Sequence, residues 1–163
     1  MPDKRFEVFV SKDSFKFNAA HFMAYPGFRE RLHGHNYRVS VRVEGRLNSD
    51  GYVIDFGDIK RAARDICHAM NERTIVPMKS DCLQIERSGG EVRITCEDGC
   101  RFAFPEADCV LLPIGHSSAE ELADYVCTRL LEELPGMPAR GVTVVEVSVA
   151  EAPAQEARCR REL

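Results

Sequence analysis

The sequence lacks a hydrophobic run long enough to cross a membrane, since no stretch approaches the roughly 20 apolar residues that a spanning helix needs. The opening residues, Met1 to Phe6, lack the apolar core of an export signal. A basic excess is also absent, because 22 Lys and Arg against 26 Asp and Glu give a formal net charge of −4. Such a charge is unsuited to neutralising nucleic-acid phosphates. We therefore expect a cytoplasmic protein with no nucleic-acid or membrane partner.

No Cys-x-x-Cys pair occurs among the seven cysteines, and an odd number cannot all pair within one chain. Cys96 and Cys100 flank Asp98-Gly99, a turn signal, but no second ligand pair at similar spacing supports a zinc knuckle. Reduced thiols, some of them buried as small apolar groups, are the expectation. Repeats and Ser/Gly-rich linkers are absent too, so the 163 residues favour a single domain over 1–163.

Apolar residues alternate with polar ones in three segments. The alternation over 6–10 resumes at Phe15 and Phe17 and predicts a long first strand or hairpin. The segment from Tyr37 to Val43 alternates strictly, and a Val-rich last strand follows at Val142 to Ala150. These patterns predict strands with one buried face.

Two helices are expected from apolar residues at helical spacing. The first, near 58–71, carries Ile59, Ala62, Ala63 and Ile66 on one face. The second begins with a capping-box signature, Ser118 followed three residues later by Glu121, and stops at Pro135-Gly136.

Between the predicted helices lies a β-meander pattern. The segments 82–87, 91–96 and 101–104 are separated by Gly89-Gly90 and Asp98-Gly99, both hairpin signals. The order strand-strand-helix, meander, helix-strand predicts an α+β fold, an antiparallel sheet with helices on one face.

Three of the five histidines form a pattern. His33 and His35 are separated by one residue just ahead of the alternating strand, so both side chains point to one face. His21 continues the phase of Phe15 and Phe17, and it comes alongside if the two strands pair. Three His without a fourth protein ligand are typical of a catalytic zinc with an open position. Such a metal polarises a bound oxygen and lowers its pKa, and Gly34 allows close approach.

At several places the sequence resembles the family of 6-pyruvoyl-tetrahydropterin and 6-carboxy-tetrahydropterin synthases. The segments that carry the resemblance are Phe17–His21 and Leu32–Tyr37 for the zinc motif, Asp55–Lys60, Ser118–Ala123 and Val147–Glu151. The resemblance implies Zn²⁺ on His21, His33 and His35. It implies a tunnelling fold (T-fold): a four-stranded antiparallel sheet with two helices on one face, here with an inserted β-meander at about 82–112. It also implies a homohexamer, a dimer of trimers with active sites between subunits.

Within this family the sequence is similar to a Glu-type subfamily, sometimes called type III. Most members carry a catalytic Cys shortly before His-Gly-His, but no Cys lies between His21 and His33, and Glu30 stands three residues before His33. The resemblance implies cleavage of the side chain of 7,8-dihydroneopterin triphosphate to 6-hydroxymethyl-7,8-dihydropterin, a folate precursor. Zinc would acidify the side-chain hydroxyls, and Glu30 would act as base and then acid in a retro-aldol cleavage.

One departure from the family concerns its acid–base pair. The family usually follows its first helix with Leu-Asp-His, whereas this sequence has Met70-Asn71-Glu72-Arg73. Glu72 is one candidate to replace the missing His, and His116, just before the second helix, is another. His68 is expected on the first helix as a packed or surface residue.

The resemblance also implies a pterin-binding role for Glu151, whose carboxylate can accept two adjacent N–H groups of the pterin ring. Ser118 is a candidate to add a hydrogen bond to the pterin, although a role as the N-cap of the second helix explains this serine equally well. A triphosphate needs local positive charge, for which the open candidates are Lys16, Arg29, Arg31 and Arg38.

Three functions stay open. The first is the Glu-type zinc-dependent pterin lyase of folate synthesis. The second keeps the fold but makes 6-pyruvoyl-tetrahydropterin by triphosphate elimination, or the 6-carboxy product of queuosine synthesis; the missing Cys argues against both. The third is a non-catalytic pterin- or zinc-binding protein, which the missing Asp-His pair favours slightly.

Overall fold

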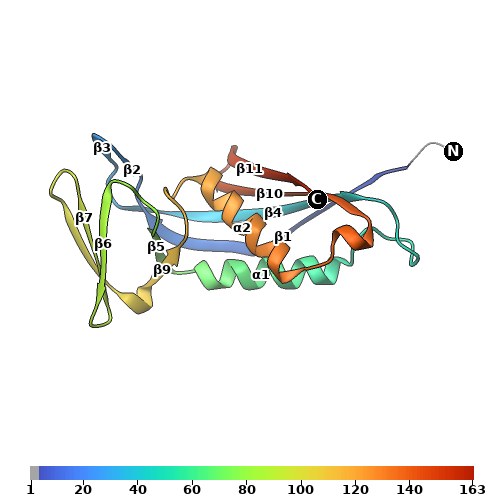
Figure 1. The fold of residues 1–163 in the computed structure, drawn as a ribbon, viewed down its shortest axis with the longest axis horizontal. Coiled ribbons are helices and arrows are strands. Elements are labelled where there is room, and N and C mark those ends of the chain that lie inside the picture. Colours follow the sequence, from blue (N-terminus) through green and yellow to red (C-terminus); the bar gives the residue numbers. More distant parts are fainter. Residues whose placement is uncertain (1–3) are drawn as a thin grey trace.

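The computed structural model describes residues 4–163, which form a large sheet, a small sheet, a short hairpin and two α-helices (Figure 1). The first three residues, part of the Met1 to Phe6 segment expected to lack an export signal, lie outside the described residues. The strands are β1 (Phe6–His21), β2 (Ala24–Tyr25), β3 (Phe28–Arg29), β4 (His33–Gly45), β5 (Arg73–Pro77), β6 (Leu83–Ser88), β7 (Glu91–Cys96), β8 (Arg101–Pro105), β9 (Cys109–Leu112), β10 (Val142–Ala152) and β11 (Gln155–Glu162). The helices are α1 (Phe56–Met70) and α2 (Ala119–Glu133), with short 3₁₀ turns η1 (Glu106–Asp108) and η2 (Pro138–Arg140).

The large sheet has the strand order β11-β10-β4-β1-β5-β9. Its first four strands are antiparallel, which confirms the expected antiparallel sheet, and the helices lie together on one side of it (Figure 1). Strands β5 and β9 extend it by parallel pairing, which the sequence analysis did not predict. Each carries a short apolar run without alternation, and such a run does not distinguish a strand from a buried helical segment. The sequence analysis did not predict β11 either, because this strand is strongly charged and none of its residues is fully buried.

An irregularity in β1 explains why its apolar alternation changes phase. The register with β4 shifts between Ser11 and Lys16, so Val10 and Phe15 face the same side of the sheet although one number is even and the other odd. A bulge adds residues to one strand and restores the facing pattern beyond it. From Phe15 onward the odd-numbered side chains of β1 are buried, and His21 ends this series.

The main core lies between the sheet and the two helices. Helix α1 packs on β1, and α2 packs on β10 and β11. Phe17 and Tyr37 are both fully buried, and their rings stack with centroids 4.7 Å apart. Burying a large apolar side chain stabilises a fold by about 1.5–3 kcal/mol, so this ring pair fixes β1 against β4 just below the histidines. Among the described residues, neither helix is long and apolar enough to cross a membrane.

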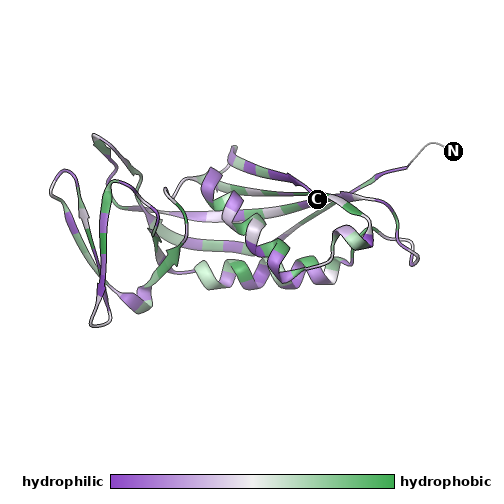
Figure 2. Cartoon of the chain, in the orientation of Figure 1, coloured by the Kyte–Doolittle hydropathy of each residue, from purple (hydrophilic) through white to green (hydrophobic). Residues whose placement is uncertain are grey.

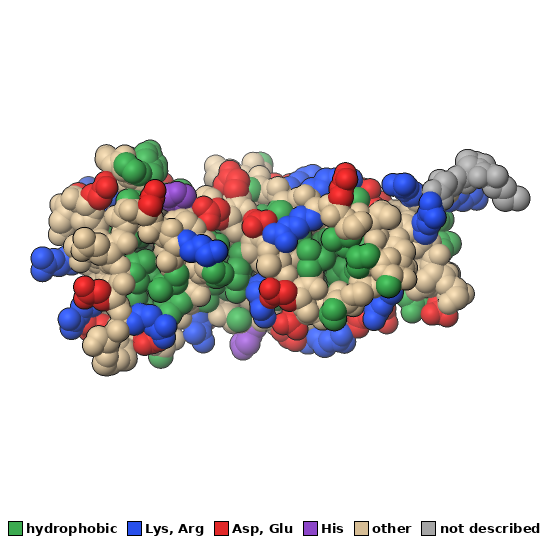
Figure 3. All heavy atoms as spheres, viewed as in Figure 1, with side chains coloured by type: hydrophobic (Ala, Val, Ile, Leu, Met, Phe, Trp, Pro, Cys, Tyr) green, Lys and Arg blue, Asp and Glu red, His purple; other side chains and the backbone are tan. Residues whose placement is uncertain are grey.

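The opposite face of the sheet is polar. Ser40 and Ser148 share a hydrogen bond of 2.8 Å between their hydroxyls, and Arg42 pairs with Glu7 and Glu146. The strands therefore alternate between hydrophobic and hydrophilic residues (Figure 2). On the side drawn in Figure 3, basic and acidic side chains are scattered among each other.

The predicted meander forms a separate three-stranded sheet, β6-β7-β8, at the end of the molecule that also carries the β2–β3 hairpin (Figure 1). Its strands confirm the three predicted segments, but the small sheet covers only 83–105 of the expected 82–112, because 109–112 forms β9 of the large sheet. Phe22, Val92 and Ile94 belong to a second buried cluster beneath it. This cluster attaches the small sheet to the segment that follows His21.

Candidate metal centre and adjoining pocket

The three histidines predicted as metal ligands meet at one end of the large sheet. His21 pairs with His33, and Ala19 pairs with His35, so the end of β1 and the start of β4 place all three rings on the helix-covered face. The ring centroids lie 4.7 Å (His21–His33), 5.1 Å (His21–His35) and 4.9 Å (His33–His35) apart. One nitrogen from each ring lies within 4.8 Å of the others. A Cβ on Gly34 would stand 3.3 Å from the carbonyl oxygen of Ala19, so a glycine here permits close strand approach.

The hydrogen bonds of these rings fit a zinc ion. His21 Nδ1 faces the carbonyl oxygen of Ser117 at 2.9 Å, and His33 Nδ1 faces the carbonyl oxygen of Arg31 at 2.8 Å. A proton on each Nδ1 leaves the Nε2 lone pair for a metal, an orientation common in zinc sites. His21 Nε2 is buried and has no hydrogen-bond partner among the described residues. A buried polar atom of this kind is costly unless a ligand satisfies it.

The spacing of the nitrogens agrees with the same ion. His33 Nε2 and His35 Nε2 are 3.1 Å apart. Zn–N bonds of about 2.0–2.1 Å in tetrahedral geometry put two ligand nitrogens roughly 3.3 Å apart. Burial lowers the pKa of His21 to about 4, with smaller effects of neighbouring groups. This ring is therefore neutral at pH 7, the form that binds a metal.

Tyr37 packs beneath two of the histidines, and two carboxylates act on its pKa. Its ring centroid is 5.8 Å from that of His21 and 5.5 Å from that of His35. Burial first, and then Glu151 and Glu30, raise the pKa of Tyr37 well above its usual value. Its buried hydroxyl makes no hydrogen bond within the described part of the chain, so the effect of Glu151 reflects proximity. Val149 pairs with Val39, which places Glu151 two residues further, beside Tyr37.

Glu30 directly follows the β2–β3 hairpin and is held by Met23. The backbone N–H of Glu30 donates to the Met23 carbonyl over 2.8 Å, and the Met23 N–H donates to Glu30 Oε2 over 3.0 Å. Glu30 is half-buried and lies close enough to His21 to act on its pKa. The second carboxylate oxygen, Oε1, takes no part in the bond to Met23.

A pocket of about 300 Å³ adjoins this region and is lined by Met23, Ser118, Glu151 and their neighbours. Ser118 is the N-cap of α2, and its hydroxyl accepts a hydrogen bond of 3.3 Å from the Glu121 N–H. The part of the capping-box prediction that concerns the Ser118 hydroxyl is therefore confirmed. The Glu121 carboxylate, however, accepts the N–H groups of Gly115 and His116 rather than that of Ser118.

The two candidates for the missing acid–base partner lie in different places. His116 Nδ1 is 3.0 Å from the carbonyl oxygen of Ala24 in β2, on the hairpin side of the centre. Glu72 has a left-handed backbone (φ 58°) and lines a separate hollow of about 410 Å³, whose lining includes His35 but neither His21 nor His33. The structure thus brings His116 to the hairpin and leaves Glu72 in a separate hollow.

Sequence reasoning missed Ser117 and Tyr37 as parts of this region. Ser117 contacts His21 through its carbonyl oxygen and through its hydroxyl, 3.2 Å from Nδ1. No local pattern marks it, because it lies 96 residues from His21 along the chain. The alternation of β4 predicts Tyr37 as a core residue, and it is buried, but the alternation does not indicate its contacts with His21 and His35.

Known proteins resemble this chain over nearly its whole length. A family model described as 6-pyruvoyl tetrahydropterin synthase matches residues 10–162. The crystal structure of the 6-pyruvoyl tetrahydropterin synthase of Plasmodium vivax is 45% identical and superposes with a TM-score of 0.95, covering 99% of this chain and 100% of that one. The Plasmodium falciparum protein of the same name is 43% identical, with a TM-score of 0.95 and the same coverage. The 6-carboxy-5,6,7,8-tetrahydropterin synthase of Haemophilus influenzae is 32% identical over 111 residues, 58% of this chain and 78% of that protein.

Two further structures of the Plasmodium vivax protein concern a glutamate that is described there as a catalytic residue. It is replaced by Ala in one and by Cys in the other, and this chain superposes on them with TM-scores of 0.94 and 0.95.

Proposed function

Because the chain belongs to the 6-pyruvoyl tetrahydropterin synthase family, whose members are lyases, we propose that it is a zinc-dependent lyase of the Glu type. It cleaves the side chain of 7,8-dihydroneopterin triphosphate to 6-hydroxymethyl-7,8-dihydropterin, a step of folate synthesis. The observation that carries the proposal is Glu30, whose carboxylate is held by the Met23 N–H, two residues after His21, in a segment without cysteine. The glutamate described as catalytic in the Plasmodium vivax protein supports the same residue type for this role.

His21, His33 and His35 are the proposed ligands, and a Zn²⁺ ion on them supplies Lewis acidity to the hydroxyls of the substrate side chain. The bond that breaks joins the first and second carbons of the side chain, and Glu30 takes the proton of the hydroxyl on the second carbon. The electrons of the broken carbon–carbon bond pass to the pterin ring, and the triphosphate leaves on a two-carbon aldehyde. Glu30 then returns its proton to the carbon next to the ring, which leaves a hydroxymethyl group.

The other proposed residues bind the substrate or hold the loop. Glu151 accepts two adjacent N–H groups of the pterin ring, and Ser118 adds a hydrogen bond from the wall of the same pocket. Met23 fixes one oxygen of Glu30, so Oε1 is the oxygen directed at the substrate proton. His116 is the better placed of the two candidates for a second proton carrier, because it contacts β2, whereas Glu72 lies in a separate hollow.

The second candidate function is a 6-carboxy-tetrahydropterin synthase, as the Haemophilus influenzae relative is named. The absence of a cysteine between His21 and His33 argues against this product and against 6-pyruvoyl-tetrahydropterin. A non-catalytic pterin- or zinc-binding protein is favoured only by the missing Asp-His pair. We also propose that the protein is a homohexamer, a dimer of trimers, because further copies can pair with the free sheet edges of one chain and cover its polar sheet face. A cytoplasmic location is proposed with it.

Product analysis tests the proposal. Zinc-loaded protein is incubated with 7,8-dihydroneopterin triphosphate, and the products are identified by mass. The hydroxymethyl product supports the proposal, whereas the pyruvoyl or carboxy product supports the second candidate. Binding of the substrate without turnover would make the protein a non-catalytic homologue.

A further inference from the structure

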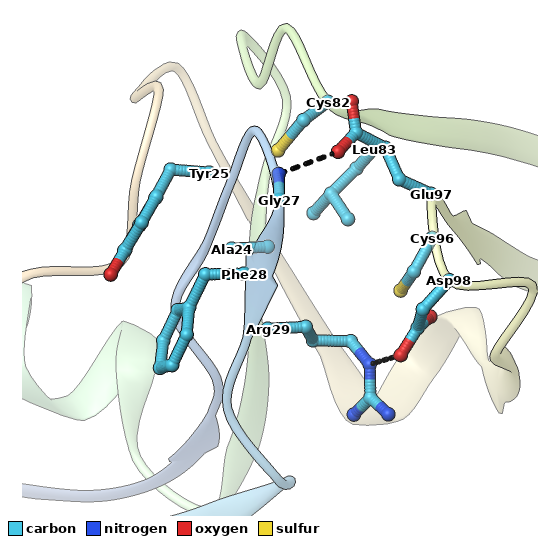
Figure 4. Close-up of a pocket in the computed structure, with 10 residues that line it drawn as sticks. All are labelled: Ala24, Tyr25, Gly27, Phe28, Arg29, Cys82, Leu83, Cys96, Glu97 and Asp98. Atoms are coloured by element: carbon cyan, nitrogen blue, oxygen red, sulfur yellow. Dashed lines mark hydrogen bonds and ion pairs between the residues drawn. The ribbon is translucent and has the colours of Figure 1, made fainter.

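The β2–β3 hairpin and the inserted β6-β7-β8 sheet face each other across a pocket of about 550 Å³ (Figure 4). The hairpin contributes Gly27 and Arg29, and the turn between β7 and β8 contributes Glu97 and Asp98. Glu30 is the next residue after the hairpin. A contact that fixes Arg29 from the sheet side therefore acts one residue away from the proposed base.

Two polar contacts bridge this pocket, as the dashed lines in Figure 4 show. The Gly27 N–H donates to Glu97 Oε2 over 3.1 Å, and Arg29 Nε donates to Asp98 Oδ2 over 2.7 Å. The carboxylate of Asp98 is itself fixed, because Oδ1 accepts the Cys100 N–H over 3.0 Å within its own turn. The Arg29 side chain is only 21% exposed and lies over the Phe102 ring at 5.9 Å. Both partners of this ion pair thus make further contacts, and the Arg29 side chain is partly shielded from water, while the Asp98 side chain is 47% exposed.

The same guanidinium also reaches the proposed base. Arg29 Nη1 donates to the carbonyl oxygen of Glu30 over 2.9 Å. One planar group therefore joins the turn of the inserted sheet to the backbone of Glu30, whose carboxylate is held from the other side by Met23. The planar guanidinium can donate to two acceptors in fixed directions, so it suits such a bridge. The compact ammonium group of a lysine cannot reproduce this geometry. These contacts also make Arg29 a poor choice among the cations considered for the triphosphate.

We propose that Asp98, acting through Arg29, is a positioning residue that fixes Glu30 relative to the three histidines. The inference rests on the proposed function, in which Glu30 moves the proton. It gives the inserted sheet a task, namely to support the loop that carries the proposed base. Loss of the ion pair would leave Glu30 present but less well placed, and misplacement of a reacting group by about 1 Å can cost up to ~100-fold in rate.

A double-mutant cycle on the full-length zinc-loaded protein tests this inference, with the variants Asp98→Asn, Arg29→Gln and both together. The first readout is hydrogen exchange of the Met23 and Glu30 amides, which donate the two bonds that hold Glu30. The second is kcat and KM for 7,8-dihydroneopterin triphosphate. Glu106→Gln is the matched control, because it breaks an ion pair with Arg87 in the same inserted sheet, away from the hairpin. Asp98→Glu tests rescue by a conserved charge.

We expect Asp98→Asn to speed exchange of both amides and to lower kcat about tenfold, with KM and bound zinc unchanged. The double variant should be no worse than Arg29→Gln alone, Asp98→Glu should recover part of kcat, and Glu106→Gln should match the parent protein. Unchanged amide exchange in Asp98→Asn overturns the inference, as does unchanged kcat, or additive losses in the double variant. If the parent protein does not turn over this substrate, the proposed function fails, while the exchange measurements still decide whether Asp98 holds Glu30 through Arg29.

Discussion

Ser117 holds the imidazole of His21 from the segment just before α2, with its carbonyl oxygen 2.9 Å and its hydroxyl oxygen 3.2 Å from Nδ1. The hydroxyl also donates to the carbonyl of Phe22 over 3.0 Å, so this serine ties the end of β1 to the segment that precedes α2. The relationship orients the most buried of the three proposed ligands.

Ser117→Ala should therefore weaken zinc binding while leaving the fold intact. Outer contacts to a metal-bound histidine are worth about 10–100-fold in metal affinity, and we expect about tenfold because the carbonyl contact remains. Competition with a chelator of known affinity measures it. Ser118→Ala is the control, since it removes a helix cap worth about 1 kcal/mol of stability without touching His21. Equal zinc affinity in the two variants would remove Ser117 from the metal centre.

His33→Ala should abolish stoichiometric zinc. His33 is exposed, so its removal creates no cavity in the core, and the melting temperature of the metal-free protein should not change. Elemental analysis after dialysis and circular dichroism measure the two properties. His68→Ala, an exposed histidine on α1, should retain one zinc per chain. A His33→Ala protein that keeps its full zinc content would contradict the proposed ligand set.

Glu30→Gln should keep zinc and lose turnover. The amide oxygen can still accept the Met23 N–H, so the loop stays in place, but the side chain can no longer take a proton. General acid–base groups contribute about 10²–10⁴-fold, and we expect a loss of kcat in that range with little change in KM. Steady-state kinetics with product identification measure it, and Glu132→Gln, an exposed residue on α2, is the control. A kcat close to that of the parent protein would mean that another group moves the proton.

Thiol reactivity should follow burial. Burial raises the pKa of Cys67 and of Cys127 to about 12, so both stay protonated at pH 8, and the thiolate is the reactive form. The partly exposed Cys82 and Cys100 should be alkylated first by iodoacetamide. Peptide mass spectrometry over time resolves the sites. Modification of Cys67 at the rate of Cys82, under conditions where the protein stays folded, would show that α1 opens readily.

The features that depend on local pattern were predicted from the sequence. Alternation indicated β4, helical spacing with a capping serine indicated α2, and paired turn signals indicated the small sheet. The spacing of two positions between His33 and His35 placed both rings on one face, because side chains on a strand repeat every second residue. The phase of His21 was sufficient to add the third ring once β1 and β4 paired.

Other features were decided only by the tertiary structure. The parallel addition of β5 and β9, the contact of Ser117 with His21 and the bridge from Asp98 to Arg29 join segments that are distant in the sequence. Asp98 and Arg29 are 69 residues apart, and each alone reads as an exposed charge. The physical reason is that periodicity, capping and turn chemistry act over a few residues, whereas packing of the helices and the inserted sheet determines which distant polar groups meet. The sequence by itself therefore determined strands β1, β4, β6–β8 and β10, the two helices and the candidate ligands. The packing decided the remaining strands and how the ligands and Glu30 are held.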